Sequence, residues 1–263
     1  HMKHTFSITI TLVVLFLLAQ FIGLFIVEKY AQQELPLGIQ PPEFKEQTAF
    51  IPIFSIILVV TVITLLLIYF RLGWLWKLWF FLSVWITLII ALAAFLPEII
   101  AIISALILTI AKLFYPTRFF HNLPEVFIYA GLAAVFTPVL NVLSISLLLI
   151  IIAIYDVIAV WKTKHMVTMA KFQTQQRVFA GFYIPYGKKS AILGGGDIGF
   201  PLLFSAVLLR QFGWPAAMLS VGLSTAALLI LLIASKKNKF YPAMPFLAAG
   251  CFIALGIAYF FTG

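Results

Sequence analysis

The sequence has few charged residues and a single cysteine. Charged side chains make up 10% of the 263 residues, whereas 64% are hydrophobic; soluble domains carry about 25% charged residues. So much apolar surface does not fit into one water-facing core, which excludes a soluble globular protein and predicts a polytopic membrane protein. The lone Cys251 cannot form an intrachain disulfide or a cysteine cage, and we expect no metal and no cofactor.

Histidine is nearly as scarce, which excludes two protease classes. The four histidines lie outside the expected helices, so an intramembrane Ser–His pair would lack its base. The sequence contains no HExxH motif, which excludes a zinc metalloprotease of that type. The net charge of +9 comes from Lys and Arg in short loops between apolar runs. That pattern is typical of membrane topology signals, so we expect no nucleic-acid partner.

Apolar runs of about 20 residues predict an all-α polytopic membrane protein with nine transmembrane helices, in a single membrane domain over 1–263. Helices one to six are expected within 5–161, at 5–27, 48–70, 78–96, 97–115 and 123–137, with the sixth ending near 161. Helices seven to nine are expected at about 193–212, 214–234 and 243–262. Residues 112–122 form an expected loop, and 162–190 a long basic loop whose apolar middle, 178–186, is too short to span. Close helix packing is the role expected for Gly222, Ser224, Gly250 and Gly256.

The uncharged run over 126–155 is either one long helix or two. Thr137-Pro138 and Asn141 offer a break, and the distribution of Lys and Arg decides between the two readings. With the break and the N-terminus inside, 14 of the 17 basic residues face the cytoplasm; without it, the split is 6 against 11. The sequence therefore predicts nine crossings, with the N-terminus cytoplasmic and the C-terminus outside.

The only two aspartates lie near the ends of apolar runs, at the same expected membrane face. Asp156 precedes Lys162 by six residues and Asp197 follows Lys189 by eight, so they lie about 9 and 12 Å deep at the helical rise. A carboxylate at a helix centre costs roughly 2.5–3.5 kcal/mol on insertion scales. Helices six and seven run in opposite directions, so the two carboxylates meet if these helices are neighbours.

Such a carboxylate pair supports more than one function. Two carboxyl groups in a low-dielectric site share one proton; the ionised member can activate water while the protonated one polarises an amide carbonyl. The same pair can serve a cation or proton transporter or a leak channel, and one buried Asp can be structural. Gly194, Gly195 and Gly196 permit unusual backbone conformations and leave room for an extended peptide to pair with the main chain. Depth and spacing alone leave these alternatives open.

Three short motifs resemble those of the presenilin and signal peptide peptidase family. Tyr155-Asp156 looks like its YD motif, Gly194-Gly195-Gly196-Asp197 fits its GxGD motif, and Pro242-Ala243-Met244 resembles its PAL motif. They occur in the family's order, on expected helices six, seven and nine. Met244 replaces the Leu of the third motif, a swap that conserves volume. The residues after Asp197 look more like signal peptide peptidase, whereas Pro245 and the cytoplasmic N-terminus look more like presenilin; this mixture suits an archaeal homologue.

The resemblance implies an intramembrane aspartyl protease of the GxGD type that hydrolyses peptide bonds within transmembrane segments of its substrates. It implies Asp156 and Asp197 as the catalytic pair, at the membrane of a microbial, archaeal cell. The residues implied to shape the site are Tyr155, Gly194, Gly195, Gly196, Pro242, Ala243 and Met244. The chain lacks presenilin's long extensions, so no obligatory partner subunit is expected beside the lipid bilayer, and a homo-oligomer is compatible with the sequence. A prepilin-type peptidase also uses a GxGD aspartate, but it is expected to have fewer helices and no PAL-like motif.

Overall fold

Long helices account for most of the computed structural model, which describes residues 6–115, 117–163, 169, 172, 179–186, 189–235 and 241–262. The nine long α-helices in these ranges are α1 Phe6–Tyr30, α2 Phe50–Tyr69, α3 Gly73–Ala93, α4 Glu98–Phe114, α5 Arg118–Phe136, α6 Val142–Val157, α8 Gly195–Phe212, α9 Trp214–Ala234 and α10 Met244–Thr262. Two strands, β1 Gly181–Tyr186 and β2 Lys189–Gly194, pair as an antiparallel hairpin. A mostly helical fold is thus confirmed, and the hairpin is the part that an all-α prediction misses.

The break between the fifth and sixth helices lies where the sequence predicts it. A 3₁₀ turn at Thr137–Val139 follows α5, and Asn141 then caps α6. The Asn141 side chain accepts a hydrogen bond from Ser144 N at 2.8 Å, and the Ser144 hydroxyl accepts one from Asn141 N at 3.0 Å. This reciprocal capping box satisfies donors that a helix start leaves free, and it begins a new helix at this point.

Several predicted helix ends are wrong. α3 begins at Gly73 rather than at 78. The predicted loop over 112–122 is largely helical: Lys112 lies in the last turn of α4, and α5 begins at Arg118. Thr117 marks that start, because its side chain accepts a hydrogen bond from Phe120 N. α8 begins two residues later than predicted, because 193 and 194 belong to β2.

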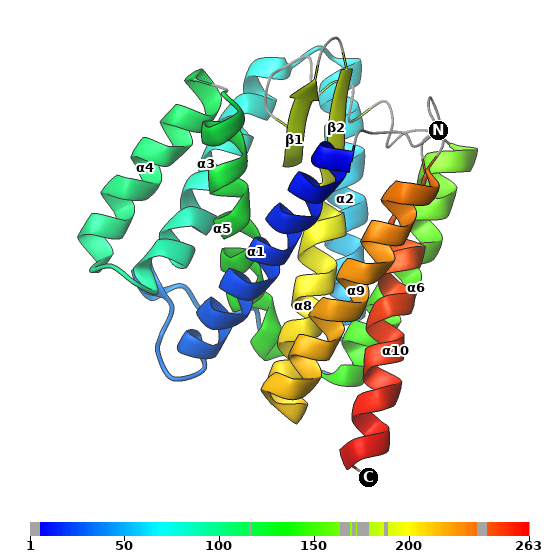
Figure 1. The fold of residues 1–263 in the computed structure, drawn as a ribbon. Coiled ribbons are helices and arrows are strands. Elements are labelled where there is room, and N and C mark those ends of the chain that lie inside the picture. The colour runs from blue at the N-terminus through cyan, green and yellow to red at the C-terminus, as the bar shows by residue number, and fades with distance from the viewer. Residues whose placement is uncertain are drawn as a thin grey trace.

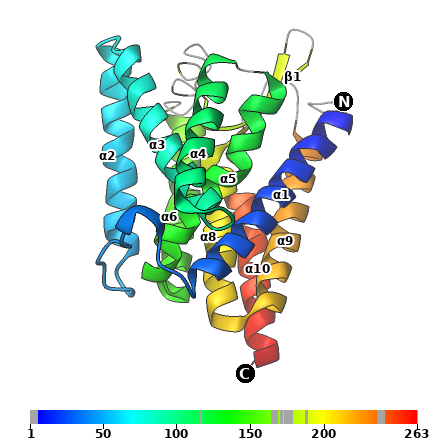
Figure 2. The same ribbon diagram turned by 90° about the vertical axis from the view of Figure 1, so that its left-hand side faces the viewer.

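The helices are arranged around α8, which packs against α1, α5, α6, α9 and α10 (Figures 1 and 2). α3 and α4 form a side group that contacts α5. The predicted close packing at Gly250 is confirmed, because a Cβ there would lie 2.6 Å from the Leu223 carbonyl oxygen and 2.9 Å from Ser224 Cα. For Gly222 and Gly256 that prediction is wrong, since a Cβ at either would meet nothing within 4 Å.

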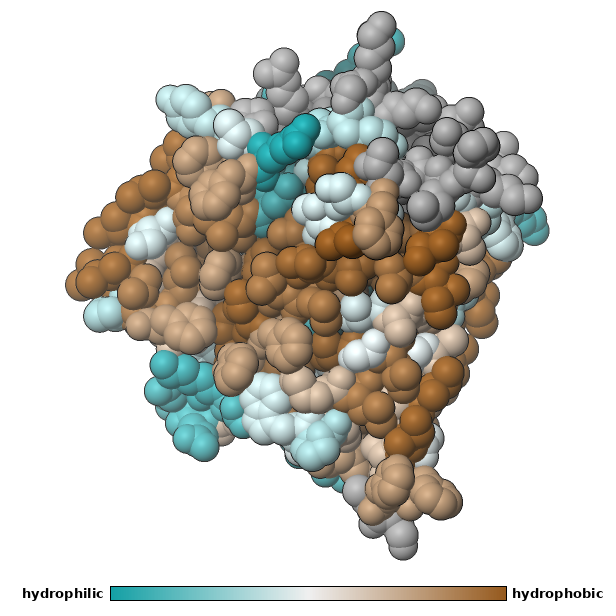
Figure 3. Space-filling model, in the orientation of Figure 1, coloured by the Kyte–Doolittle hydropathy of each residue, from teal (hydrophilic) through white to brown (hydrophobic). Residues whose placement is uncertain are grey.

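The outer surface is that of a membrane protein. Seven helices among the described residues are long and apolar enough to cross a membrane; α4, with 17 residues, and α8, which carries Asp197 and Arg210, are not among them. Hydrophobic side chains cover the middle of the face shown in Figure 3, with hydrophilic ones towards its two ends. The chain therefore builds an integral membrane domain.

Residues predicted to lie outside the cell gather at one end of the molecule. Arg210, at the end of α8, forms an ion pair of 3.2 Å with Glu46 and donates a 2.8 Å hydrogen bond to the Pro138 carbonyl. Trp214 Nε1 donates to Glu28 at 2.5 Å. α1 begins at the hairpin end and α10 ends at the opposite one (Figure 1). These residues lie at the same end of the molecule, as nine crossings would require. Which end faces the cytoplasm stays a prediction.

The hairpin occupies most of the predicted apolar stretch at 178–186, of which residue 178 lies outside the described residues. Its register pairs Phe182 with Leu193 and Ile184 with Ala191. All four side chains are buried, at 0, 4, 6 and 0% exposure respectively. Alternate residues thus face the helices, which is the period of a strand with one buried face. The segment covers the hairpin end of the helices and leads directly into α8.

Candidate active site

Asp156 lies in the last turn of α6, just before a π turn at Ile158–Lys162. Its side chain is 4% exposed. The main-chain N–H of Met244 donates a 3.1 Å hydrogen bond to Asp156 Oδ2, and the main-chain N–H of Ala243 also faces this carboxylate. The start of α10 therefore holds Asp156 through main-chain groups. The buried Pro242 directly precedes these donors.

Asp197 is the third residue of α8, and Gly194 caps this helix. The carboxylate turns back towards the cap, where the Gly194 main-chain N–H donates to it; a Cβ at Gly194 would lie 3.3 Å from Asp197 Oδ2. A Cβ at Gly195 would lie only 2.6 Å from the Tyr129 hydroxyl. At Gly196 the nearest contact of an added Cβ would be an ordinary 3.5 Å. The first two glycines therefore fit tightly, and the third does not have to be glycine.

The two aspartates come together because their helices are neighbours. α6 packs against α8, and α10 packs against both. Asp156 and Asp197 lie close enough for their charges to interact. Asp156 is near the end of α6 and Asp197 near the start of α8, and these two helix ends point towards the hairpin end of the molecule (Figure 1). The structure thus brings together Asp156, the stretch from Gly194 to Asp197 and the segment 242–244 from three separate places in the chain.

Tyr155 contacts α2. Its hydroxyl lies 3.4 Å from Thr61 Oγ1, and its ring packs edge-on against Phe54 with the centroids 6.0 Å apart. Tyr155 therefore links α6 to α2 and is not placed beside Asp197 by these contacts.

A buried charged cluster that no sequence motif marks lies behind Asp197. Lys112 Nζ and Glu125 Oε1 are 2.6 Å apart, and both side chains are 1% exposed. The Tyr129 hydroxyl donates to Glu125 Oε2, and the Gly181 main-chain N–H donates to the same oxygen at 3.0 Å. The signal available in the sequence is a lone glutamate inside an apolar helix. The lysine falls in the predicted loop over 112–122 and gives no such signal.

His121 corrects the expectation that every histidine lies outside the helices. It stands in the first turn of α5, is 6% exposed, and its Nε2 is 3.0 Å from the Gly181 carbonyl oxygen. Among the described residues, no serine hydroxyl hydrogen-bonds to this ring. His121 therefore contacts the hairpin from within α5.

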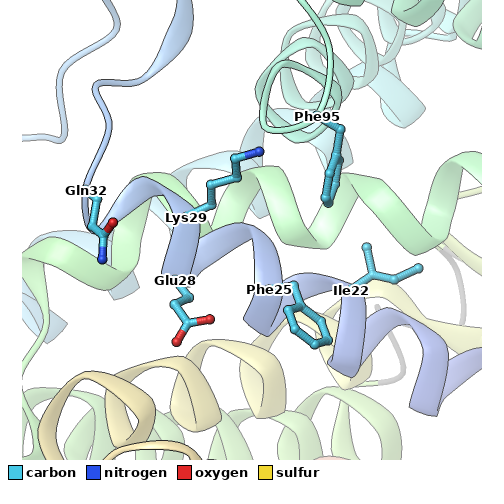
Figure 4. A pocket seen from close by; sticks show the side chains of 6 residues that line it. All are labelled: Ile22, Phe25, Glu28, Lys29, Gln32 and Phe95. Carbon is cyan, nitrogen blue, oxygen red and sulfur yellow. The ribbon is translucent and has the colours of Figure 1, made fainter.

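A surface pocket of about 410 Å³ lies away from the aspartates, around the end of α1. Figure 4 shows the six side chains that line it. They are Ile22, Phe25, Glu28, Lys29, Gln32 and Phe95. Two of them already have partners, because Glu28 accepts from Trp214 and Lys29 lies over the Phe95 ring. Among the described residues, no group of three or more His, Cys, Asp and Glu is arranged to hold a metal.

The chain matches one protein-family model and several solved structures. A family model described as signal-peptide peptidase, presenilin aspartyl protease matches residues 13–196, which is well over half of the chain and ends one residue before Asp197. No curated protein sequence matches the chain. Two solved structures described as a presenilin family intramembrane aspartate protease, in the C222 and P2 space groups, match with TM-scores of 0.68 and 0.66. They are 19% and 20% identical, cover 94% and 96% of this chain, and are themselves covered over 95% and 97%. At this identity the likeness concerns the fold.

Proposed function

The chain belongs to the signal-peptide peptidase and presenilin aspartyl protease family, and we propose that Asp156 and Asp197 are the catalytic pair of this intramembrane protease. Its substrates are transmembrane segments of other membrane proteins. The observation that carries the proposal is the meeting of the two aspartates of the sequence, from α6 and α8, at one end of a membrane domain.

The pair supports hydrolysis through one shared proton. The ionised carboxylate accepts a proton from water as the water oxygen attacks the amide carbon, while the protonated carboxylate donates a hydrogen bond to the amide oxygen. The tetrahedral intermediate then collapses as a carboxyl proton passes to the amide nitrogen and the C–N bond breaks. The pair again holds one proton at the end of the cycle.

The segment 242–244 supports this chemistry from α10. The segment contributes main-chain N–H groups, which donate hydrogen bonds to Asp156. The side chains of Asp156 and Asp197 are the groups that react. The glycines before Asp197 let its carboxylate turn back to the helix cap. We assign Pro242, Ala243, Gly194 and Gly195 to shaping the site, Met244 to donating its N–H, and Tyr155 to holding α6 against α2.

An extended stretch of substrate fits the open edge of the hairpin. Side chains of α5 occupy the outer edge of β1: Asn122 exchanges two 2.9 Å hydrogen bonds with the Tyr183 main chain, and Glu125 accepts from Gly181 N. The outer edge of β2 has no strand partner among the described residues. Strand addition satisfies such an edge. A substrate strand on β2 would run towards Asp197, because β2 leads directly into α8.

The decisive experiment compares the purified chain with its Asp156→Asn and Asp197→Asn variants on a fluorogenic transmembrane peptide in detergent. Each variant should lose at least about 10²- to 10⁴-fold in kcat, because each removes one partner of the proton exchange. Glu98→Gln is the matched control, since it neutralises an exposed carboxylate at the start of α4. A hydroxyl-containing transition-state isostere should block the wild type.

Equal cleavage by wild type and the Asn variants would show a contaminating protease and reject the assignment of the pair. Failure of the wild type to cleave any of several transmembrane peptides would reject the proposed activity. The experiment uses the chain alone, so cleavage would also support action without a partner subunit.

We further propose nine crossings with a cytoplasmic N-terminus, in an archaeal cell membrane. The support is the excess of Lys and Arg in the predicted cytoplasmic segments. The native Cys251 is fully buried, so we expect it not to react with a thiol-labelling reagent. A cysteine at the exposed position Glu43 should react with an impermeant reagent from outside; reaction only after the cells are opened would reverse the topology.

A further inference from the structure

The buried ion pair of Lys112 and Glu125 has no part in the proposed hydrolysis, yet it lies beside the site. Removing two charges from solvent is so costly that apolar residues of similar volume often replace a buried pair with no loss of stability. Both side chains are 1% exposed. A contribution to stability therefore does not explain why this pair is present. The hydrogen-bond partners of the two side chains are more informative.

Those bonds follow one face of α5 from the hairpin to α8. Asn122, Glu125 and Tyr129 are three and four residues apart, so they stand on the same side of the helix. Asn122 binds the Tyr183 main chain, and Glu125 Oε2 accepts from Gly181 N. This ladder of contacts, formed by Asn122 and Glu125, thus binds side chains of α5 to main-chain groups at the start of β1.

Tyr129 continues the ladder to Asp197. Its hydroxyl donates to Glu125 Oε2, the oxygen that also holds Gly181. The same hydroxyl lies where a Gly195 side chain would be, and the ring lies 3.4 Å from the Cβ position of Gly199. Gly195 and Gly199 stand two residues before and after Asp197, and Tyr129 interacts electrostatically with that carboxylate. The phenol therefore lies against the backbone that carries Asp197.

The other end of Glu125 is fixed by Lys112. Its ammonium group pairs with Glu125 Oε1 at 2.6 Å and donates a 3.1 Å hydrogen bond to the His121 carbonyl. Lys112 also lies over the Phe80 ring, 5.8 Å from its centroid. These contacts come from α3, α4 and α5, so the carboxylate of Glu125 is anchored to three helices that do not carry the catalytic residues.

We propose that Glu125 and Tyr129, anchored by Lys112, are positioning residues that set the place of Asp197 relative to Asp156 and to the hairpin. This inference rests on the proposed function of the aspartate pair. Neither residue donates or accepts a proton in the reaction. A misplacement of about 1 Å at a reacting group costs about 10²-fold in rate, so removal of the hydroxyl should act on kcat.

The first test is Tyr129→Phe, which keeps the ring against Gly199 and removes only the hydroxyl. We expect kcat to fall about 10- to 100-fold with KM unchanged. Tyr30→Phe is the matched control: it also removes one hydroxyl hydrogen bond, to the Ile90 carbonyl at 2.6 Å, but at the far end of α1. The two variants should unfold at similar temperatures, and Tyr30→Phe should keep the wild-type kcat.

The second test separates positioning from simple charge compensation. Glu125→Leu alone leaves Lys112 buried without a counter-charge and is expected to fold poorly. The double variant Lys112→Met with Glu125→Leu removes both charges at similar volume and should recover the melting temperature. We expect its kcat to stay about 10- to 100-fold below wild type, because Gly181 and Tyr129 have both lost their acceptor.

Two results would overturn the inference: a double variant with wild-type kcat, or a Tyr129→Phe variant that matches Tyr30→Phe. Each cleavage rate is expressed relative to that of the wild type, and the Asp197→Asn variant gives the background rate. A wild type that does not cleave rejects the proposed function, whereas an active wild type with active Tyr129→Phe and double variants rejects only the positioning role.

Discussion

Both aspartates accept main-chain hydrogen bonds, but they differ in what supports them from behind. Asp197 stands on a helix packed on several sides, and its backbone lies against the side chain of Tyr129. Asp156 stands at the end of α6, beside a π turn, and accepts its hydrogen bond from the main chain of Met244. Side-chain identity thus matters behind one aspartate, whereas backbone position matters beside the other.

The surroundings of the two aspartates differ in the same way. The span that contains α5, behind Asp197, has 61% of an 18-residue apolar stretch buried within the protein, and it carries Glu125, which pairs with Lys112 of α4. α2, on the Asp156 side, has only 17% of such an 18-residue stretch buried and packs against α6 and α3 (Figure 2). A helix with few internal contacts is easier to displace. We infer that the Asp156 side is the more adjustable half of the site.

The largest expected effect comes from filling the space behind Asp197. Gly195→Ala places a Cβ 2.6 Å from the Tyr129 hydroxyl, so either the ring or the start of α8 must shift. We expect kcat on a transmembrane peptide to fall about 10²-fold. Gly196→Ala is the matched neighbour, because its Cβ meets only an ordinary 3.5 Å contact. That variant should keep activity within about two-fold of wild type, because an alanine there is good for the helix.

Similar losses in both alanine variants would mean that backbone freedom, and not the contact with Tyr129, explains the glycines. That result would remove one side of the comparison. Combining Gly195→Ala with Tyr129→Phe sharpens the test, because the closest clashing atom is then gone while the ring carbons remain at about 3.0–3.1 Å. The expected outcome is a kcat above that of Gly195→Ala but no higher than that of Tyr129→Phe alone.

A smaller effect is expected from a change in the packing of α10, whose first residue donates a main-chain hydrogen bond to Asp156. Gly250→Ala introduces a Cβ 2.6 Å from the Leu223 carbonyl oxygen and should push α10 away from α9. Overpacking of this kind costs about 1–3 kcal/mol of stability. Gly256→Ala is the control on the same helix, with nothing within 4 Å, and should be neutral or stabilising by up to about 1 kcal/mol. Thermal unfolding in detergent measures both; equal melting temperatures would contradict the close packing.

The sequence predicts the helices and the aspartate pair because both follow from local signals. Apolar runs of span length locate nine helices, and Pro138 with Asn141 locates the break between α5 and α6. Asp156 and Asp197 are conspicuous because carboxylates are costly inside a membrane. Their helices must be neighbours for the pair to act, and the structure places them so.

What the sequence does not reveal depends on partners distant in the chain. Lys112 resembles a helix end until Glu125 is known to pair with it, thirteen residues later and in another helix. The hairpin is short and apolar, and its strand period emerges only when Phe182 and Ile184 are seen to face the same helices. Tyr129 has no motif of its own, because its role is defined by the glycines it touches.

The smallest effect is expected from Met244→Leu, which restores the usual third residue of the PAL motif. The contribution of Met244 to Asp156 is its main-chain N–H, and the leucine variant keeps that donor. A volume-conserving swap of this kind costs less than about 1.5 kcal/mol even when buried, as Met244 is at 3% exposure. We expect kcat and KM within about two-fold of wild type. A large change in either would show that the side chain at 244 contacts the substrate or Asp156, and the contrast between side-chain support behind Asp197 and main-chain support beside Asp156 would then fail.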